Sequence, residues 1–292
     1  MEWFVLAFIS AIFSATSTIL EKKNLFTLDA LQFSFVLAIL NMIFSLPFFI
    51  GVDFASLSLM SLVVLYFKTV LGALAFLSVM MAIKNMEISG SLPLLVLTPG
   101  LVALFAFFFL GESLSALEIS GMFLLLAGTY LLEAKPGYDV FRPFKIFYKS
   151  KYHHYIIFAL LLFTVTAILD KVLLKNYQLP PKPFLGFQQF FLAINFVIIV
   201  LFTKKNPVKL IKKINSSAWI WIIMASLLTV GYRYTQIEAV KIAPVALVLS
   251  IKRTSVFFAA IGGGKIFSEK NLVKKAIATT VMIIGALFII NY

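Results

Sequence analysis

The residues of this sequence that could do chemistry are positively charged side chains inside apolar segments. Lys252 and Arg253 stand side by side near the middle of an apolar run that extends from Pro244 to Gly264. Two cations at the centre of such a run cost roughly 2.5–3.5 kcal/mol each on membrane-insertion scales. Cations at that depth face a water-filled cavity or an anionic partner. The pair therefore predicts a membrane protein that binds a negatively charged group.

Two further cations lie deep in apolar segments. Lys68 falls near the middle of the third such segment, and Arg233 lies toward the end of the eighth. A guanidinium offers a planar fork that matches phosphate or carboxylate, and an ammonium offers a movable point charge. We therefore expect these four cations to bind substrate. The alternative is that they pair with carboxylates from other helices, and for Arg233 the nearby Glu238 is the candidate partner.

Carboxylates and small polar residues complete the candidate site. Glu21-Lys22 and Asp170-Lys171 each stand at the end of an apolar segment. The two carboxylates could act as gates or proton-responsive groups, or the pairs could simply end a helix at the membrane surface. A polar stripe at helical spacing on the first segment suits either a cavity wall or close helix packing. The predicted cavity wall consists of Ser10, Ser14, Ser17, Asn41, Gln188 and Asn195.

Other kinds of site find little support in the sequence. His153 and His154 have no ligand partners in view, so no metal site is predicted. The chain contains no Cys, which excludes thiolate ligands and a Cys nucleophile. No nucleophile–base arrangement and no nucleic-acid-binding motif stands out. We therefore expect no enzymatic activity, no cofactor and no nucleic-acid partner.

These residues belong to a chain with the composition of a polytopic membrane protein. Of its 292 residues, 62% are hydrophobic and 32 are Phe. Ten apolar segments emerge, each long enough to cross about 30 Å of hydrocarbon at about 1.5 Å per residue. They cover residues 2–20, 29–50, 60–83, 88–110, 114–133, 153–174, 184–203, 216–237, 243–264 and 272–291.

The two halves of the chain repeat each other. At an offset of 157 without gaps, residues 82–132 align with 239–289, and Gly128 meets Gly285. Each half holds five segments, and an odd number inverts the second copy. The predicted fold is all-α, with ten transmembrane helices in two inverted five-helix repeats. Residues 1–134 form the first repeat, 135–152 a basic aromatic linker on the membrane surface, and 153–292 the second repeat.

Glu112 and Glu269 occupy matching positions in the two repeats, just before the last segment of each. A carboxylate at the start of a helix accepts hydrogen bonds from its free amide groups and favours the positive end of its dipole. We therefore expect each to cap the helix that follows it.

Positive charges outside the apolar segments predict the orientation. Seventeen of the 25 Lys and Arg residues fall on one side of the predicted membrane, including five in the linker, and four fall on the other. Loops rich in Lys and Arg face the cytoplasm. The linker is therefore expected in the cytoplasm and both termini outside the cell membrane. The net charge of +13 has the same origin, so it does not indicate nucleic acid.

The repeat and its motifs resemble those of a known family. Ten helices in two inverted halves, with Gly111-Glu112 and Ser268-Glu269 opening the last helix of each, look like the drug/metabolite transporter superfamily. Within it the chain resembles the EamA-type transporters. The resemblance covers nearly the whole chain and is strongest over 82–132 and 239–289. It implies a multi-pass membrane transporter.

A narrower stretch is similar to the plastid sugar-phosphate translocators. It comprises Tyr234-Thr235-Gln236-Ile237, then Ala243-Pro244, then Lys252-Arg253. In that family a Lys-Arg pair binds the substrate phosphate, helped by a Tyr and by a Lys from the first half. The similarity implies that Lys252 and Arg253 bind phosphate, that Tyr234 assists, and that Lys68 is the first-half cation. The spacing from Pro244 to Lys252 is two residues shorter here, a rotation of about 200° on a helix.

Together these observations predict a secondary transporter of a small organic anion, such as a phosphorylated or carboxylated metabolite, that uses alternating access. An empty carrier would have to reorient with several unpaired buried cations, so exchange (antiport) is also expected. One alternative is a proton-coupled exporter of amino acids or drugs, with Glu21 or Asp170 as the coupling acid. Others are a flippase for an anionic or lipid-linked substrate and a non-transporting membrane scaffold. Because the chain contains both halves of a carrier, either a monomer or a homodimer would be functional.

Overall fold

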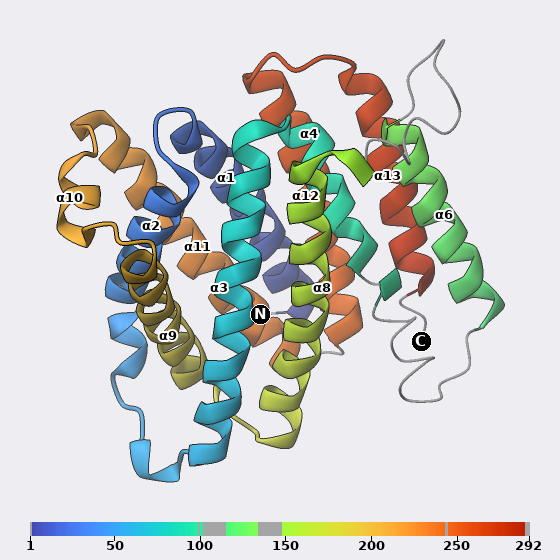
Figure 1. Ribbon diagram of the computed structural model, residues 1–292. Helices are drawn as coiled ribbons and strands as arrows, with labels where there is room; N and C mark the ends of the chain where they lie inside the picture. Colours follow the sequence, from blue (N-terminus) through green and yellow to red (C-terminus); the bar gives the residue numbers. More distant parts are fainter. Residues whose placement is uncertain (1, 99, 102–114, 134–147, 243–244, 290–292) are drawn as a thin grey trace.

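The computed structural model describes residues 2–98, 100–101, 115–133, 148–242 and 245–289, and it is helical with no strand in these ranges (Figure 1). The first half contains α1 (Trp3–Leu25), α2 (Ala30–Ser45), α3 (Leu59–Asn85), α4 (Ile88–Ser91) and α6 (Ala116–Glu133). The second half contains α8 (Lys151–Lys171), α9 (Pro181–Phe202), α10 (Pro207–Lys212), α11 (Ser216–Ile242), α12 (Val245–Ile266) and α13 (Leu272–Ile289). Short 3-10 helices cover Leu46–Phe49, Phe54–Ser56 and Leu92–Leu97, and a π-helical turn covers Val172–Asn176.

Each of the ten predicted apolar segments contains a described helix. By length and composition, five stretches of the described chain could cross a membrane: Trp3–Leu25, Ala30–Phe49, Leu59–Asn85, Lys151–Asn176 and Pro181–Phe202. Most of the linker and the end of the fourth segment lie outside the described residues. The short surface helix α10 is additional to the ten segments, since its run between Pro207 and Lys212 is too short to span a bilayer.

The fourth segment begins irregularly, as its prolines indicate. α4 continues into a 3-10 helix over Leu92–Leu97, with Pro93 at its start. Proline lacks the amide hydrogen that an α-helical turn needs. The matching segment of the second half differs, because α12 runs as a regular α-helix through Gly262–Gly264.

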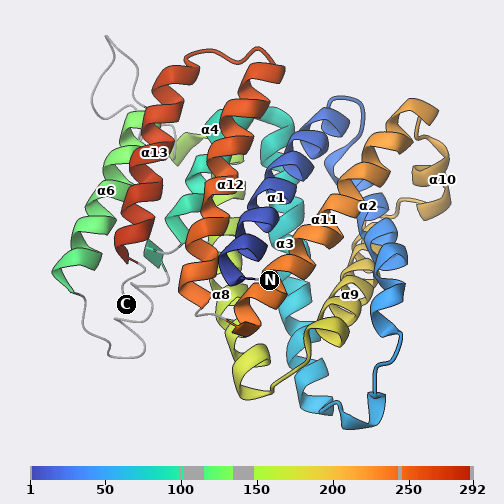
Figure 2. The same cartoon turned by 180° about the vertical axis from the view of Figure 1, so that it is seen from behind.

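The helices pack in pairs that the 157-residue offset relates to one another. α1 packs most extensively on α11, and the corresponding pair α8–α3 is similarly close. α2 packs on α9, and α6 packs on α13 at one side of the molecule (Figures 1 and 2). The connections α1–α2, α3–α4 and α12–α13 gather at the upper end of Figure 1, and α2–α3 and α8–α9 at the lower end.

Two glycines allow the close approach of α6 and α13. A Cβ atom on Gly285 would lie 2.7 Å from the carbonyl oxygen of Gly121, and one on Gly128 would lie 2.9 Å from that of Ala278. The same offset of 157 relates Gly128 to Gly285 and Gly121 to Ala278. The two halves therefore make this crossing in reciprocal fashion.

Candidate functional site

A cavity of about 320 Å³ lies between the two halves, beside α1, α2, α3, α8, α9, α11 and α12. It is the natural candidate for a binding site because charged and amide side chains converge on it among apolar ones. The polar residues on its wall include Ser14, Glu21, Asn41, Lys68, Asp170, Gln188, Tyr232, Arg233, Gln236 and Lys252.

Lys68, Asp170, Gln188 and Arg233 form what we name the cavity cluster. The buried ammonium of Lys68 forms an ion pair with the Asp170 carboxylate and donates a hydrogen bond of 2.9 Å to Gln188 Oε1. Arg233 Nη2 donates to the same oxygen at 2.7 Å and lies 3.7 Å from Asp170 Oδ2. Lys68 comes from the first half and the other three from the second. Two deep cations from different halves thus share one amide oxygen and one carboxylate.

Lys252 reaches the cavity beside this cluster. Its ammonium hydrogen-bonds Gln236 Oε1 and lies 4.8 Å from the centre of the Tyr232 ring. Gln236 Oε1 also accepts a bond of 3.3 Å from Arg233 Nη1. An amide oxygen and an aromatic face both favour a cation. Three of the four cations selected from the sequence therefore meet on one cavity wall.

The fourth cation, Arg253, follows Lys252 on α12, but its side chain lies outside the described part of the structure, as do Glu112 and Pro244. Tyr234 does not reach the cavity wall. Its ring packs against Phe48 with centroids 4.9 Å apart. Tyr232 lies on the wall in its place, because two positions along α11 rotate a side chain by about 200°.

The pairing of the deep cations decides between two alternatives and corrects one expectation. The alternative that Lys68 pairs with a carboxylate from another helix is the one observed, and Asp170 is its partner. The sequence proposed Glu238 as the partner of Arg233, whereas the contacts of Arg233 in the described structure are Asp170, Gln188 and Gln236. Both outcomes arise because α8 packs against α3 and brings Asp170 within reach of Lys68, while Arg233 extends from α11 toward the same carboxylate.

The carboxylates of the two acid–base pairs both reach the cavity. Glu21, near the end of α1, and Asp170, near the end of α8, line it together. Glu21 is buried and accepts a hydrogen bond of 3.2 Å from Ser17 Oγ. Its neighbour Lys22 turns away and donates to the backbone oxygens of Ile83 and Met86. The side chain of Lys171 lies outside the described part.

The predicted polar wall divides into two groups. Ser14, Asn41 and Gln188 line the cavity. Ser10 instead donates to the Tyr232 backbone oxygen at 2.8 Å, and Ser17 bonds Thr229 Oγ1 at 2.9 Å, so both join α1 to α11. Asn195 donates to Thr69 Oγ1 at 3.3 Å and joins α9 to α3. The second group therefore serves helix packing rather than the wall.

Among the cavity residues that sequence reasoning missed are Tyr232 and Gln236, which both contact Lys252. A usable signal was present in the spacing. Gln236 lies three positions after Arg233, and it lies four positions after Tyr232. Residues at these spacings share one face of a helix. Once Arg233 is placed at a cavity, helical periodicity predicts that both neighbours accompany it.

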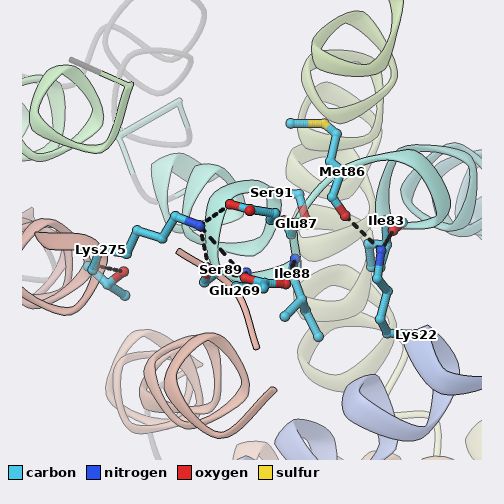
Figure 3. Close-up of polar contacts among 10 residues, drawn as sticks. Lys22, Ile83, Met86, Glu87, Ile88, Ser89, Ser91, Glu269 and Lys275 are labelled. Carbon is cyan, nitrogen blue, oxygen red and sulfur yellow. Dashed lines mark hydrogen bonds and ion pairs between the residues drawn. The ribbon is translucent and has the colours of Figure 1, made fainter. Parts of the chain in front are cut away.

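A second polar cluster lies where α4 meets the α12–α13 connection, and we name Glu87, Ser89, Glu269 and Lys275 the face cluster (Figure 3). The buried Glu269 carboxylate accepts hydrogen bonds from the backbone amides of Ile88 at 2.7 Å and Ser89 at 3.0 Å. Glu269 was expected to cap its own helix, α13. In the structure it caps α4 of the other half, because the α12–α13 connection folds over the start of α4.

Cations complete the face cluster and its surroundings. Lys275 pairs with the Glu87 carboxylate, donates to Ser89 Oγ at 2.8 Å and lies 3.7 Å from Glu269. On the other side of α4, the Lys22 ammonium approaches Ile83 O at 2.5 Å and Met86 O at 2.8 Å (Figure 3). Helix ends are thus neutralised by side chains from elsewhere in the chain, as the helix dipole favours.

Comparison with known proteins agrees with this architecture. The model of the EamA-like transporter family matches residues 1–133 and 151–291. A solved structure described only as "Crystal structure of protein" superposes with a TM-score of 0.65 at 15% sequence identity, covering 98% of this chain and 95% of that chain. That likeness concerns the fold alone. No curated protein matches the chain at a significant level.

Proposed function

The chain belongs to the EamA-like transporter family, and from that premise we propose that it is a secondary transporter that carries a small organic anion through the cavity by alternating access. The observation that carries the anionic preference is the convergence of Lys68, Arg233 and Lys252 on one wall. Cations in a low-dielectric site attract an anionic group far more strongly than cations in water.

The residues have distinct roles in this proposal. Arg233 and Lys68 bind the anionic group from opposite halves, and Gln188 holds both in place. Lys252 binds a second part of the substrate or of its anionic group, and Tyr232 forms the adjacent wall. Arg253 joins them as the neighbouring cation on α12. Both a phosphate and a carboxylate are anionic acceptors that can take hydrogen bonds from these donors.

The architecture in this proposal is ten transmembrane helices in two inverted repeats, over 1–134 and 153–292, joined by the 135–152 linker. The reciprocal α6–α13 crossing and the related pairs α1–α11 and α8–α3 support it. From the charge distribution we propose that the linker lies in the cytoplasm and the termini outside. The working unit is a monomer or a homodimer.

Alternating access assigns a role to the face cluster as well. Glu269 and Lys275 of the second half hold α4 of the first half at the upper end of the molecule. We propose that these bonds hold that end closed, so that a substrate passing there would require them to break.

A second candidate is a proton-coupled exporter, because two carboxylates, Glu21 and Asp170, line the cavity. Carboxylates inside a membrane protein often carry protons. Transport that survives Glu21→Gln and Asp170→Asn but is lost in Lys252→Gln would count against this candidate.

The proposed function is tested by thermal unfolding of the purified protein with sugar phosphates, carboxylates, amino acids and organic cations. A ligand at 100 times its dissociation constant adds about 2.7 kcal/mol of stability. We expect stabilisation by anions that is lost in Lys252→Gln. The matched control is Lys241→Gln on the exposed end of α11. Stabilisation by cations or zwitterions alone would contradict an anion carrier.

A further inference from the structure

We infer that Asp170 is an internal counter-anion: in the empty carrier its carboxylate occupies the place beside Lys68 and Arg233 that the substrate's anionic group takes. This inference rests on the proposed function and deepens it. It assigns Asp170 the control of whether the carrier moves substrate in one direction or only exchanges it.

Asp170 is well placed for this role. Both ion pairs of the cavity wall among the described residues are made by its carboxylate, one to Lys68 and one to Arg233. Its side chain is 20% exposed, more than those of its two partners at 5% and 13%. It therefore lies on the cavity side of the cluster, where an entering anion meets the same two cations.

The contact between Asp170 and Arg233 is incompletely made. Arg233 Nε is buried and has no hydrogen-bond partner among the described residues, whereas Asp170 Oδ1 forms the ion pair with Lys68. The 3.7 Å between Arg233 Nη2 and Asp170 Oδ2 is too long for a hydrogen bond. Buried ion pairs that serve structure alone tend to have their remaining polar atoms satisfied. A substrate anion would therefore replace Asp170 without losing a complete network.

Gln188 keeps the two cations in position while the carboxylate moves. Its Oε1 accepts from Lys68 at 2.9 Å and from Arg233 at 2.7 Å, independently of Asp170. Asp170 is also the next-to-last residue of α8, two positions before the π-helical turn Val172–Asn176 begins. Such turns are frequent at functional sites. The cations are thus anchored, and the carboxylate sits where the helix geometry changes.

The consequence concerns the empty carrier. A carrier that reorients with unpaired buried cations faces a large electrostatic barrier. The sequence led us to expect exchange on this ground. With Asp170 as counter-ion, Lys68 and Arg233 stay paired when no substrate is bound. The empty carrier then returns, and net transport takes place.

The decisive variant is Asp170→Asn, in the full chain reconstituted into liposomes, with inorganic phosphate and pyruvate as the two probes. Uptake into empty vesicles measures net transport, and uptake into vesicles loaded with the same probe measures exchange. We expect binding of the responsive probe to tighten about tenfold, because its competitor is gone, and net uptake to fall about tenfold. Exchange should change less than about threefold.

Two further variants keep the test decisive where Asp170→Asn folds poorly. Asp170→Glu retains the charge and should retain net uptake. The double variant Lys68→Gln/Asp170→Asn restores the net charge of the wild-type cluster but removes one binding cation. It should bind the probe about tenfold more weakly than Asp170→Asn, and its ratio of net uptake to exchange should rise above that of Asp170→Asn. A ratio of net uptake to exchange as low as that of Asp170→Asn in both of these variants would overturn the inference.

Failure of the inference is distinguishable from failure of the proposed function. If neither probe nor any other anion of the panel binds the wild type, the proposed function and the inference both fall. If the wild type binds a probe but Asp170→Asn loses exchange and net uptake together without tighter binding, only the inference is overturned. Asp170 would then be a proton-coupling or structural residue.

Discussion

The cavity cluster and the face cluster both join the two halves through charged side chains, but they differ in how many of their buried polar atoms have hydrogen-bond partners. In the face cluster, each oxygen of the Glu269 carboxylate meets a backbone amide, and Lys275 hydrogen-bonds Glu87 and Ser89. In the cavity cluster, Arg233 Nε is buried without a hydrogen-bond partner among the described residues, and Arg233 Nη2 stays 3.7 Å from Asp170. The difference teaches that a completed network fixes a contact, whereas an incomplete one beside a cavity favours binding.

The largest expected effect breaks the cavity cluster by removing one partner. Lys68→Met should lower the free energy of unfolding by about 3–5 kcal/mol, because it leaves the Asp170 carboxylate without its main counter-ion. The measurement is equilibrium unfolding of the purified protein. Lys241→Met, at an exposed position, is the control. Adding Asp170→Asn to Lys68→Met should recover most of the loss, and no recovery would mean that the pair is not coupled.

An intermediate effect is expected in the face cluster. Glu269→Gln should lower the free energy of unfolding by about 1–3 kcal/mol. Glutamine has one acceptor oxygen, so one of the two backbone amides of α4 loses its hydrogen bond, and the other is left with an uncharged acceptor. Glu2→Gln at an exposed position is the comparison. Hydrogen exchange at Ile88 and Ser89 would rise in Glu269→Gln alone. Unchanged exchange there would show that Glu269 does not hold α4 in solution.

A contact without charges sharpens the comparison further. Gly285→Ala should destabilise the α6–α13 crossing by about 1–3 kcal/mol, because the new Cβ meets the Gly121 backbone at 2.7 Å. Gly72→Ala is the matched control, with no heavy atom within 4 Å of its Cβ. Equal stability of the two variants, measured by thermal unfolding, would contradict the close approach of α6 and α13.

The smallest effect is expected for a charge pair at the surface. Lys84 Nζ lies 2.9 Å from Asp29 Oδ1, and this hydrogen bond and charge hold the pKa of the Asp29 carboxyl below its ordinary value. The lowered pKa stabilises the fold above the pKa of the unfolded state, and the gain disappears as the pH falls through the folded value. Because Asp29 is mostly exposed, Asp29→Asn should cost less than about 0.5 kcal/mol at neutral pH. The measurement is unfolding of the wild type and of Asp29→Asn at neutral and acidic pH, and a larger loss of unfolding free energy in the variant at neutral pH would contradict the prediction.

The cavity could be predicted only in part from the sequence. Lys68, Arg233 and Lys252, which line the cavity, were found because a charged residue inside an apolar segment can be recognised from the sequence alone. Asp170 and Gln188 were also selected, but their pairing with these cations was not predicted, because the partners come from other helices. The face cluster was misassigned for the same reason. Glu269 and Ile88 are 181 residues apart, and nothing local indicates that they meet.

The sequence by itself determined the helices, their approximate ends, the family and the depth of the charged residues. These follow from local properties, since a bilayer demands about 20 apolar residues per crossing and penalises each buried charge. Only the tertiary structure decided which charges meet. It turned Tyr232 rather than Tyr234 toward the cavity, placed Asp170 between Lys68 and Arg233, and brought Glu269 to the other half. Pairing depends on how helices rotate and cross, which is set by packing across the whole molecule.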